Sequence, residues 1–136
     1  MKYDKICGIG AAMITPFHPD GTLDCEALCR NIDYVIAGGA DYIVALGTTA
    51  ETPTLTAEEK QTIIDLTRRH VAGRAPIVVG MGGNNTAELC RQLRAMDTEG
   101  ISAVLSVTPY YNKPSQEGLY QHYKAVAEAS PLPVIL

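Results

Sequence analysis

Residues 41–70, "DYIVALGTTAETPTLTAEEKQTIIDLTRRH", contain one complete strand–loop–helix unit, and this unit decides how the rest of the chain is interpreted. After Asp41, its first residues (42–47, "YIVALG") contain no charged side chain and form a short apolar run, which is typical of a parallel strand covered on both faces. Thr56 and Glu59 have the spacing of a capping box, so we expect a helix from there to about His70. The stretch therefore predicts a strand, a polar turn and a helix, in that order.

The same order recurs on both sides of this unit. Further strands are expected at residues 7–15, 75–82, 101–109 and 132–136. Helix caps are expected at polar residues that precede helical apolar patterns: Asp24, Thr56, Asn85 or Thr86, and Ser115. Four complete βα units at intervals of roughly 25–35 residues indicate a parallel sheet with helices outside it.

Two folds fit four βα units and a fifth strand. A flavodoxin-like sheet would have about this length, but such chains normally finish with a helix that covers the last strand. A (β/α)8 TIM barrel needs roughly 250 residues. Because the sequence stops on the apolar run "LPVIL" (132–136), we predict that residues 1–136 are the N-terminal half of a (β/α)8 barrel, a single incomplete domain with the start of strand five.

Composition excludes several classes of protein. The net charge is −4 and the Lys and Arg residues are scattered, so no nucleic-acid surface is expected. No apolar stretch reaches the roughly 18 residues that span a membrane. The four cysteines and three histidines lack the spacing of a metal site, so we expect no metal and interpret the cysteines as free thiols of a cytoplasmic protein.

Two loops at predicted carboxyl ends of strands carry groups suited to chemistry. The "GTTAET" turn (47–52) offers hydroxyls and backbone N–H groups that can hold a carboxylate, although a Thr-rich turn that only caps itself is the alternative. The "TPYYN" turn (108–112) contains two adjacent tyrosines. A phenol hydrogen-bonded to a Thr hydroxyl can relay protons, and tyrosines also pack at subunit interfaces. Both interpretations of each loop stay open.

Together, "LGTTAETPTL" (46–55) and "VTPYYNKPSQEGLYQHYKAVAEASPLPVIL" (107–136) resemble the dihydrodipicolinate synthase family, a branch of the pyruvate-dependent Schiff-base aldolases and lyases built on the (β/α)8 barrel. The resemblance implies a homotetrameric carbon–carbon lyase of lysine and diaminopimelate biosynthesis. Such an enzyme condenses pyruvate with L-aspartate 4-semialdehyde through a lysine Schiff base, without a cofactor.

The resemblance also assigns roles to residues. Thr48 matches the proton-relay threonine, Thr49 the residue that holds the pyruvate carboxylate, and Tyr111 the relay tyrosine that crosses a dimer interface. The residues that match a feedback-inhibition pocket for lysine at the same interface are Thr52, Asn84, Glu88 and Tyr110. Two departures stand out. Lys60 and Ala57 replace histidines of some lysine-sensitive members, and Ala50 replaces a glycine, which requires that its φ not be positive.

The resemblance places the Schiff-base lysine and a second relay tyrosine beyond residue 136, so the 136-residue chain alone is expected to be inactive. Lys2 and Lys5 precede the first strand, Lys60 and Lys124 lie on predicted helices and are expected to face outward, and Lys113 lies in a polar loop. We expect none of the five to have the apolar pocket or the nearby cations that lower a lysine pKa. The alternatives are another pyruvate-dependent enzyme, such as N-acetylneuraminate lyase, or a non-catalytic half-barrel.

Overall fold

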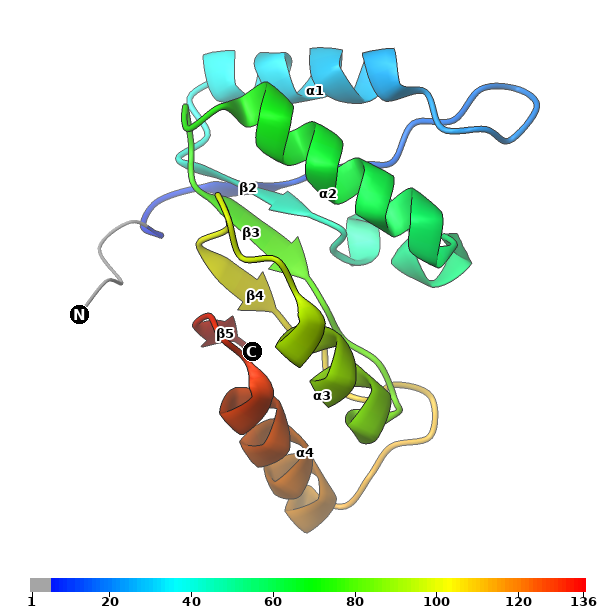
Figure 1. Cartoon of the computed structure of the whole chain (residues 1–136), viewed down its shortest axis with the longest axis vertical. Coiled ribbons are helices and arrows are strands. Elements are labelled where there is room, and N and C mark those ends of the chain that lie inside the picture. Colours follow the sequence, from blue (N-terminus) through cyan, green and yellow to red (C-terminus); the bar gives the residue numbers. More distant parts are fainter. Residues whose placement is uncertain (1–5) are drawn as a thin grey trace.

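The structure, a computed structural model, describes residues 6–136 and consists of one sheet with helices between its strands (Figure 1). The strands are β1 (Gly10–Ala12), β2 (Tyr42–Ala45), β3 (Ile77–Gly80), β4 (Ala103–Leu105) and β5 (Val134–Ile135). The helices are α1 (Cys25–Ala37), α2 (Ala57–Val71), α3 (Thr86–Ala95) and α4 (Gln116–Ala129), with short 3-10 turns η1 (Thr48–Ala50) and η2 (Thr52–Thr54).

The strand order distinguishes the two candidate folds. All four strand pairs are parallel, and the order across the sheet is β1-β2-β3-β4-β5. A flavodoxin-like sheet has the order 2-1-3-4-5, because its first strand lies between the second and the third. The observed consecutive order is instead that of a barrel wall, as predicted.

The helices begin where local side-chain chemistry predicts. The Thr56 backbone N–H donates to the Glu59 carboxylate at 2.7 Å, and the Glu59 N–H donates to Thr56 Oγ1 at 3.2 Å, which completes the capping box. Asn85 rather than Thr86 caps α3, by accepting the Glu88 N–H at 3.1 Å. Such a cap stabilises a helix by about 1 kcal/mol.

The strands are shorter than the sequence predicts, and the end of β2 shows why. Leu46 has a φ of 55°, a left-handed conformation that interrupts the extended backbone directly after β2. The neighbouring strand approaches this corner closely. A Cβ atom at Gly80 would lie 2.0 Å from the Leu46 carbonyl oxygen, so only glycine fits at the end of β3.

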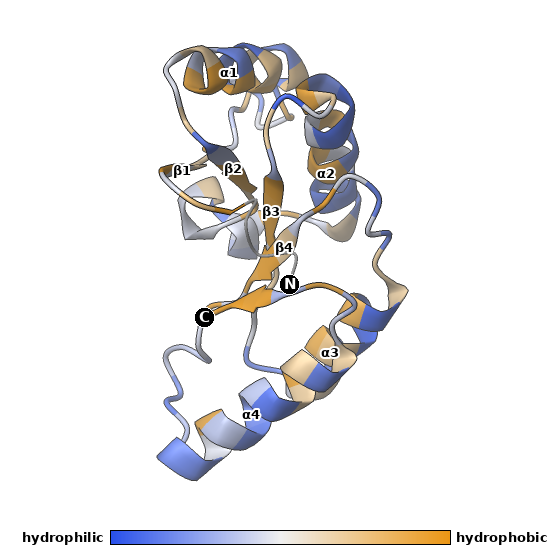
Figure 2. Ribbon diagram, turned by 90° about the vertical axis from the view of Figure 1, so that its left-hand side faces the viewer, coloured by the Kyte–Doolittle hydropathy of each residue, from blue (hydrophilic) through white to orange (hydrophobic). Residues whose placement is uncertain are grey.

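The two faces of the sheet are covered differently. On one face, Ile43, Ile77 and Val79 pack with α1 and α2 residues, and Val104 packs with residues of α3 and α4. On the other face, Val44, Val78 and Ala103 contact apolar residues from strands and from the segment before β1, and none from a helix. Figure 2 shows the strands as the most uniformly apolar elements, whereas the helices carry both polar and apolar faces. This one-sided covering is the arrangement of a barrel wall.

Two edges of the sheet are unpaired within residues 6–136. β1 pairs only with β2, and β5 pairs only with β4. Among these same residues, no helix is both long enough and apolar enough to cross a membrane.

Candidate active site

The loop after β2 holds the first group of predicted site residues at the carboxyl end of the sheet. Thr52 Oγ1 lies within hydrogen-bond distance of the carbonyl oxygens of Leu46, at 2.9 Å, and Gly47, at 2.8 Å. The buried Thr15, which follows β1, donates its hydroxyl to the Ala50 carbonyl at 2.8 Å. Hydrogen bonds within the loop therefore hold its conformation, and the bond from Thr15 attaches it to the segment that follows β1.

This fixed loop presents two hydroxyls to the exterior. Thr48 and Thr49 form the first two residues of η1, and both are exposed. Neither hydroxyl has a hydrogen-bond partner within residues 6–136. Ala50 is 2% exposed and is absent from the non-glycine residues with positive φ, so alanine fits where the resembling family has glycine. Two hydroxyls on a rigid turn are suited to hold a carboxylate or to pass a proton.

The loop after β4 holds the tyrosine pair in a strained turn. The Asn112 N–H donates to the Tyr110 carbonyl at 2.9 Å, which closes a three-residue turn centred on Tyr111. Tyr111 has a φ of 65°, a left-handed backbone conformation that residues other than glycine rarely adopt. The Asn84 side chain accepts a hydrogen bond from the Tyr110 N–H and donates one to the Tyr110 carbonyl, both with a donor–acceptor distance of 2.8 Å. The loop after β3 therefore holds this turn in place.

The structure brings together some of the predicted residues but not others. Thr48, Thr52 and Tyr110 line one cavity of about 380 Å³ at the carboxyl ends of β2, β3 and β4. Tyr111 is 93% exposed, does not line this cavity, and shares no hydrogen bond with Thr48 within the described residues. A side chain that projects from its own chain in this way is available to a second subunit.

The expectation that Lys60 faces outward is wrong. Lys60 lines the same cavity as Thr48 and Tyr110, and it also lines a neighbouring cavity of about 500 Å³ together with Glu88. The reason is the direction of the helix. A helix that follows a parallel strand runs back along the sheet, so its first turn lies beside the carboxyl ends of the strands. Lys60 is the fourth residue of α2, and its position in that first turn was the signal that could have identified it.

Two polar groups of α4, the buried His122 and the half-buried Tyr123, were not identified from the sequence. His122 of α4 is 4% exposed, and its Nδ1 lies 2.8 Å from the Thr86 hydroxyl at the start of α3. Burial lowers the pKa of His122 below its usual value, because the charged imidazolium would lose its hydration. The Tyr123 hydroxyl donates to the carbonyl of the buried Ser106 at 3.2 Å, and burial raises the Tyr123 pKa. These contacts connect α4 to the start of α3 and to the residue that follows β4.

Metal-ligating side chains do not converge in the part of the chain that the structure describes. No group of three or more His, Cys, Asp or Glu residues within positions 6–136 could hold a metal ion. The four cysteines are free thiols, and only Cys90 is buried.

Comparison with known proteins identifies the family that this arrangement represents. The dihydrodipicolinate synthetase family model matches residues 5–136. The 4-hydroxy-tetrahydrodipicolinate synthase of Parabacteroides distasonis is 58% identical over 129 residues, which are 95% of this chain and 43% of that protein. The enzyme of the same name from Bacillus subtilis is 47% identical over 94% of this chain and 44% of its own length. The chain thus spans less than half the length of these curated relatives.

Solved structures give the same result for the fold. The crystal structure of the chloride-inhibited dihydrodipicolinate synthase from Acinetobacter baumannii, complexed with pyruvate, superimposes with a TM-score of 0.91 and 46% identity over 96% of this chain and 45% of that one. The 4-hydroxy-tetrahydrodipicolinate synthase from Methylacidiphilum fumariolicum gives a TM-score of 0.89 and 43% identity over 97% of this chain and 44% of its own. The prediction of a partial (β/α)8 barrel is confirmed.

Proposed function

Because this chain belongs to the dihydrodipicolinate synthetase family, we propose that its whole protein is a 4-hydroxy-tetrahydrodipicolinate synthase. In this proposal the enzyme is a carbon–carbon lyase of the class I aldolase type. It condenses pyruvate with L-aspartate 4-semialdehyde in lysine and diaminopimelate biosynthesis. Residues 1–136 form the N-terminal half of one barrel domain and supply part of the active site. The single observation that carries the proposal is the pair of free hydroxyls on the fixed turn of Thr48 and Thr49.

The chemistry assigns a step to each of these groups. A lysine amine and the ketone of pyruvate form an imine and release water, and loss of a methyl proton then gives an enamine. The Thr49 hydroxyl and backbone orient the pyruvate carboxylate, so that the enamine carbon meets the aldehyde. Thr48 and Tyr111 pass the protons that these steps release and take up. Cyclisation by the amine of the second substrate finally frees the lysine amine.

We place the imine-forming lysine and a second relay tyrosine outside residues 1–136. Lys113 lies in the exposed loop after β4, and Lys124 lies on the outer helix α4. Lys60 lines the cavity at the strand ends, but it projects from a helix and not from a strand of the barrel wall. Lys2 and Lys5 lie outside the residues that the structure describes.

We propose further that the enzyme is a cytoplasmic homotetramer and needs no metal or organic cofactor. The exposed and strained Tyr111 supports an assembly in which this side chain completes the site of a partner subunit. Such an assembly would also bring the loops of Asn84 and Tyr110 to the interface between subunits. Thr52, Asn84, Glu88 and Tyr110 would line an effector pocket there, as the family resemblance predicts.

The experiment that tests the proposed reaction is a substrate comparison with the purified whole enzyme. We expect pyruvate to condense with L-aspartate 4-semialdehyde at least 100-fold faster, as kcat/KM, than with N-acetylmannosamine, the substrate that an N-acetylneuraminate lyase would use. The reverse preference would replace the proposed reaction with that of the related lyase. Activity with neither aldehyde would reject both assignments.

A further inference from the structure

The buried hydroxyl of Thr15 connects the segment after β1 to the turn that carries Thr48 and Thr49. Its Oγ1 donates to the carbonyl oxygen of Ala50, the last residue of η1, at 2.8 Å. Within residues 6–136, no other hydrogen bond joins Thr48, Thr49 or Ala50 to a different strand or helix. This one hydrogen bond therefore attaches the turn to the barrel wall.

The turn needs such an attachment because its backbone is unfavourable on both sides. Leu46 before it and Glu51 after it each have a φ of 55°, a left-handed conformation that residues other than glycine rarely adopt. Thr52 bonds to the carbonyl oxygens of Leu46 and Gly47, but it belongs to the same loop. Backbone conformations of this kind persist only where surrounding contacts enforce them. Thr15 provides such a contact from outside the loop.

Thr15 itself lies behind the turn, on the side of the sheet that the helices cover. It lines a small internal cavity together with Leu28 of α1 and Ile63 of α2, and both of these residues belong to the core on that side. Of the described residues, those that line the cavity at the carboxyl ends of the strands include Thr48 but not Thr15. Thr15 can therefore act on a substrate only through the backbone of Ala50.

We propose that Thr15 is a positioning residue of the enzyme, whose hydroxyl fixes the place of the η1 turn and so of the Thr48 and Thr49 hydroxyls. This inference rests on the proposed function, in which Thr49 orients the pyruvate carboxylate and Thr48 passes protons. Loss of the Thr15 hydroxyl leaves the Ala50 carbonyl without its donor in a buried place, so the turn shifts. A displacement of about 1 Å in a group that positions a substrate can lower a rate about 10²-fold.

Borohydride trapping of the whole enzyme over a range of pyruvate concentrations tests the proposal without the second substrate. Thr15→Val keeps nearly the same shape but lacks the hydroxyl, and it should raise the half-saturating pyruvate concentration about 10-fold, as expected for loss of one hydrogen bond. Thr15→Ala also removes the hydroxyl and should give a similar increase. Thr15→Ser keeps the hydroxyl and should behave as the unmodified enzyme. A purely structural role would lower the fraction of enzyme that reacts but not change the half-saturating concentration.

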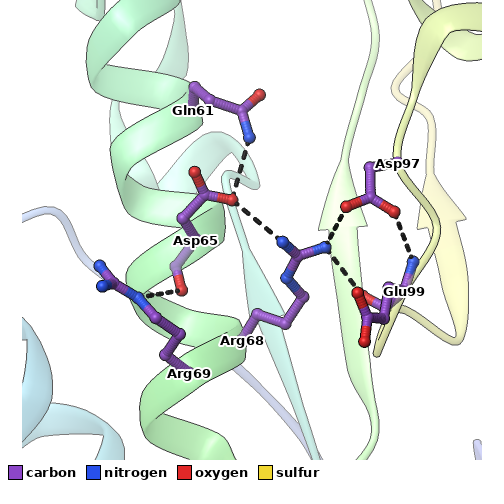
Figure 3. Close-up of polar contacts among 6 residues, drawn as sticks. All are labelled: Gln61, Asp65, Arg68, Arg69, Asp97 and Glu99. Carbon is purple, nitrogen blue, oxygen red and sulfur yellow. Dashed lines mark hydrogen bonds and ion pairs between the residues drawn. The ribbon is translucent and has the colours of Figure 1, made fainter.

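The matched control removes a contact between two elements that does not touch the turn. Arg68 of α2 pairs with Asp65 and with Asp97 of the segment after α3, and it also donates to the Glu99 carbonyl (Figure 3). Arg68→Gln should lower the stability of the enzyme in urea and leave the half-saturating pyruvate concentration unchanged.

Hydrogen exchange of the turn, followed by mass spectrometry of the whole enzyme, measures the same effect without any reaction. The Ala50 and Glu51 N–H groups donate to the carbonyls of Gly47 and Thr48, each at 3.0 Å. Thr15→Val should accelerate their exchange about 10-fold or more, because the turn opens more easily without its attachment. Thr15→Ser should leave their exchange unchanged.

The two measurements separate failure of this inference from failure of the proposed function. An unmodified enzyme that traps no pyruvate would reject the proposed function, and hydrogen exchange alone would then decide whether Thr15 fixes the turn. Three results would overturn the inference: exchange of the turn that Thr15→Val leaves unchanged, a pyruvate dependence that Thr15→Val leaves unchanged in an enzyme that does trap pyruvate, or equal effects of Thr15→Ser and Thr15→Val.

Discussion

Tyr111 combines an unfavourable backbone conformation with an almost fully exposed side chain. A non-glycine residue at a φ of 65° costs about 1–3 kcal/mol, and such residues cluster at functional sites. The double hydrogen bond between Asn84 and the Tyr110 backbone holds the turn in this conformation. Packing does not explain the strain, because the side chain is 93% exposed. Our proposal that the phenol acts in a partner subunit's site would account for it.

Two substitutions of Tyr111 distinguish the effect of its backbone strain on stability from the effect of its hydroxyl on catalysis. Tyr111→Phe should leave the free energy of unfolding of the chain unchanged and should lower kcat of the whole enzyme about 10²- to 10⁴-fold, the usual contribution of a proton-transfer group. Tyr111→Gly should raise the free energy of unfolding by up to about 1 kcal/mol, because glycine adopts positive φ without strain. Full activity of Tyr111→Phe would remove the tyrosine from the proposed relay.

His122 should make the stability of the chain depend on pH. Its pKa in the folded chain lies below the unfolded value near 6.5 because burial disfavours the imidazolium. Below that pH the unfolded chain takes up a proton more readily than the folded one. The contribution of neutral His122 is therefore complete above about pH 6.5 and is lost progressively as the pH falls toward the folded pKa.

Urea unfolding at a series of pH values measures this contribution. His122→Asn should flatten the decline in the free energy of unfolding between about pH 6.5 and 5. Thr86→Val removes the hydroxyl 2.8 Å from His122 Nδ1 but not the titrating group, so it should lower stability and keep the decline. An equally steep decline in His122→Asn would assign it to other groups.

At the scale of elements, helix starts were predictable from the sequence and strand ends were not. Asp24, Thr56, Asn85 and Ser115 cap their helices through bonds to residues three positions along, so the signal is local. The end of β2 depends instead on a positive φ at Leu46, a residue type that gives no sign of it. The same holds for Tyr111. Only contacts with neighbouring strands and loops impose these conformations.

The close approach of β3 to the end of β2 gives an element-scale prediction. Gly80→Ala would place a methyl group 2.0 Å from the Leu46 carbonyl oxygen, and both groups lie in or beside strands that cannot move independently. We expect a loss of about 3 kcal/mol or more in the free energy of unfolding, since overpacking against the backbone cannot relax. Urea denaturation of the chain measures it.

Gly83→Ala is the matched control for this substitution. A Cβ atom at Gly83, three residues further along, would meet no atom within 4 Å, and the φ of Gly83 is not positive. We expect it to change the free energy of unfolding by less than about 1 kcal/mol. Equal effects of the two substitutions would contradict the close contact at Gly80.

At the scale of the whole molecule, the described residues form part of a barrel wall with part of an active site. β1 and β5 are each unpaired on one side, and Val44, Val78 and Ala103 on the helix-free face contact only strands and the segment before β1. The carboxyl ends of the strands carry Thr48 and Thr49. The groups that form and use an imine are divided, in our proposal, between this half and the rest of the protein.

Borohydride reduction in the presence of pyruvate, followed by intact-mass measurement, tests this division most directly. The 136-residue chain and the whole protein would be treated in parallel, and peptide mapping would locate any modified lysine. We predict a pyruvate adduct on the whole protein, at a lysine outside residues 1–136, and none on the 136-residue chain. An adduct on the 136-residue chain, at Lys60 or Lys113, would contradict the account and require an imine-forming lysine within this half of the barrel.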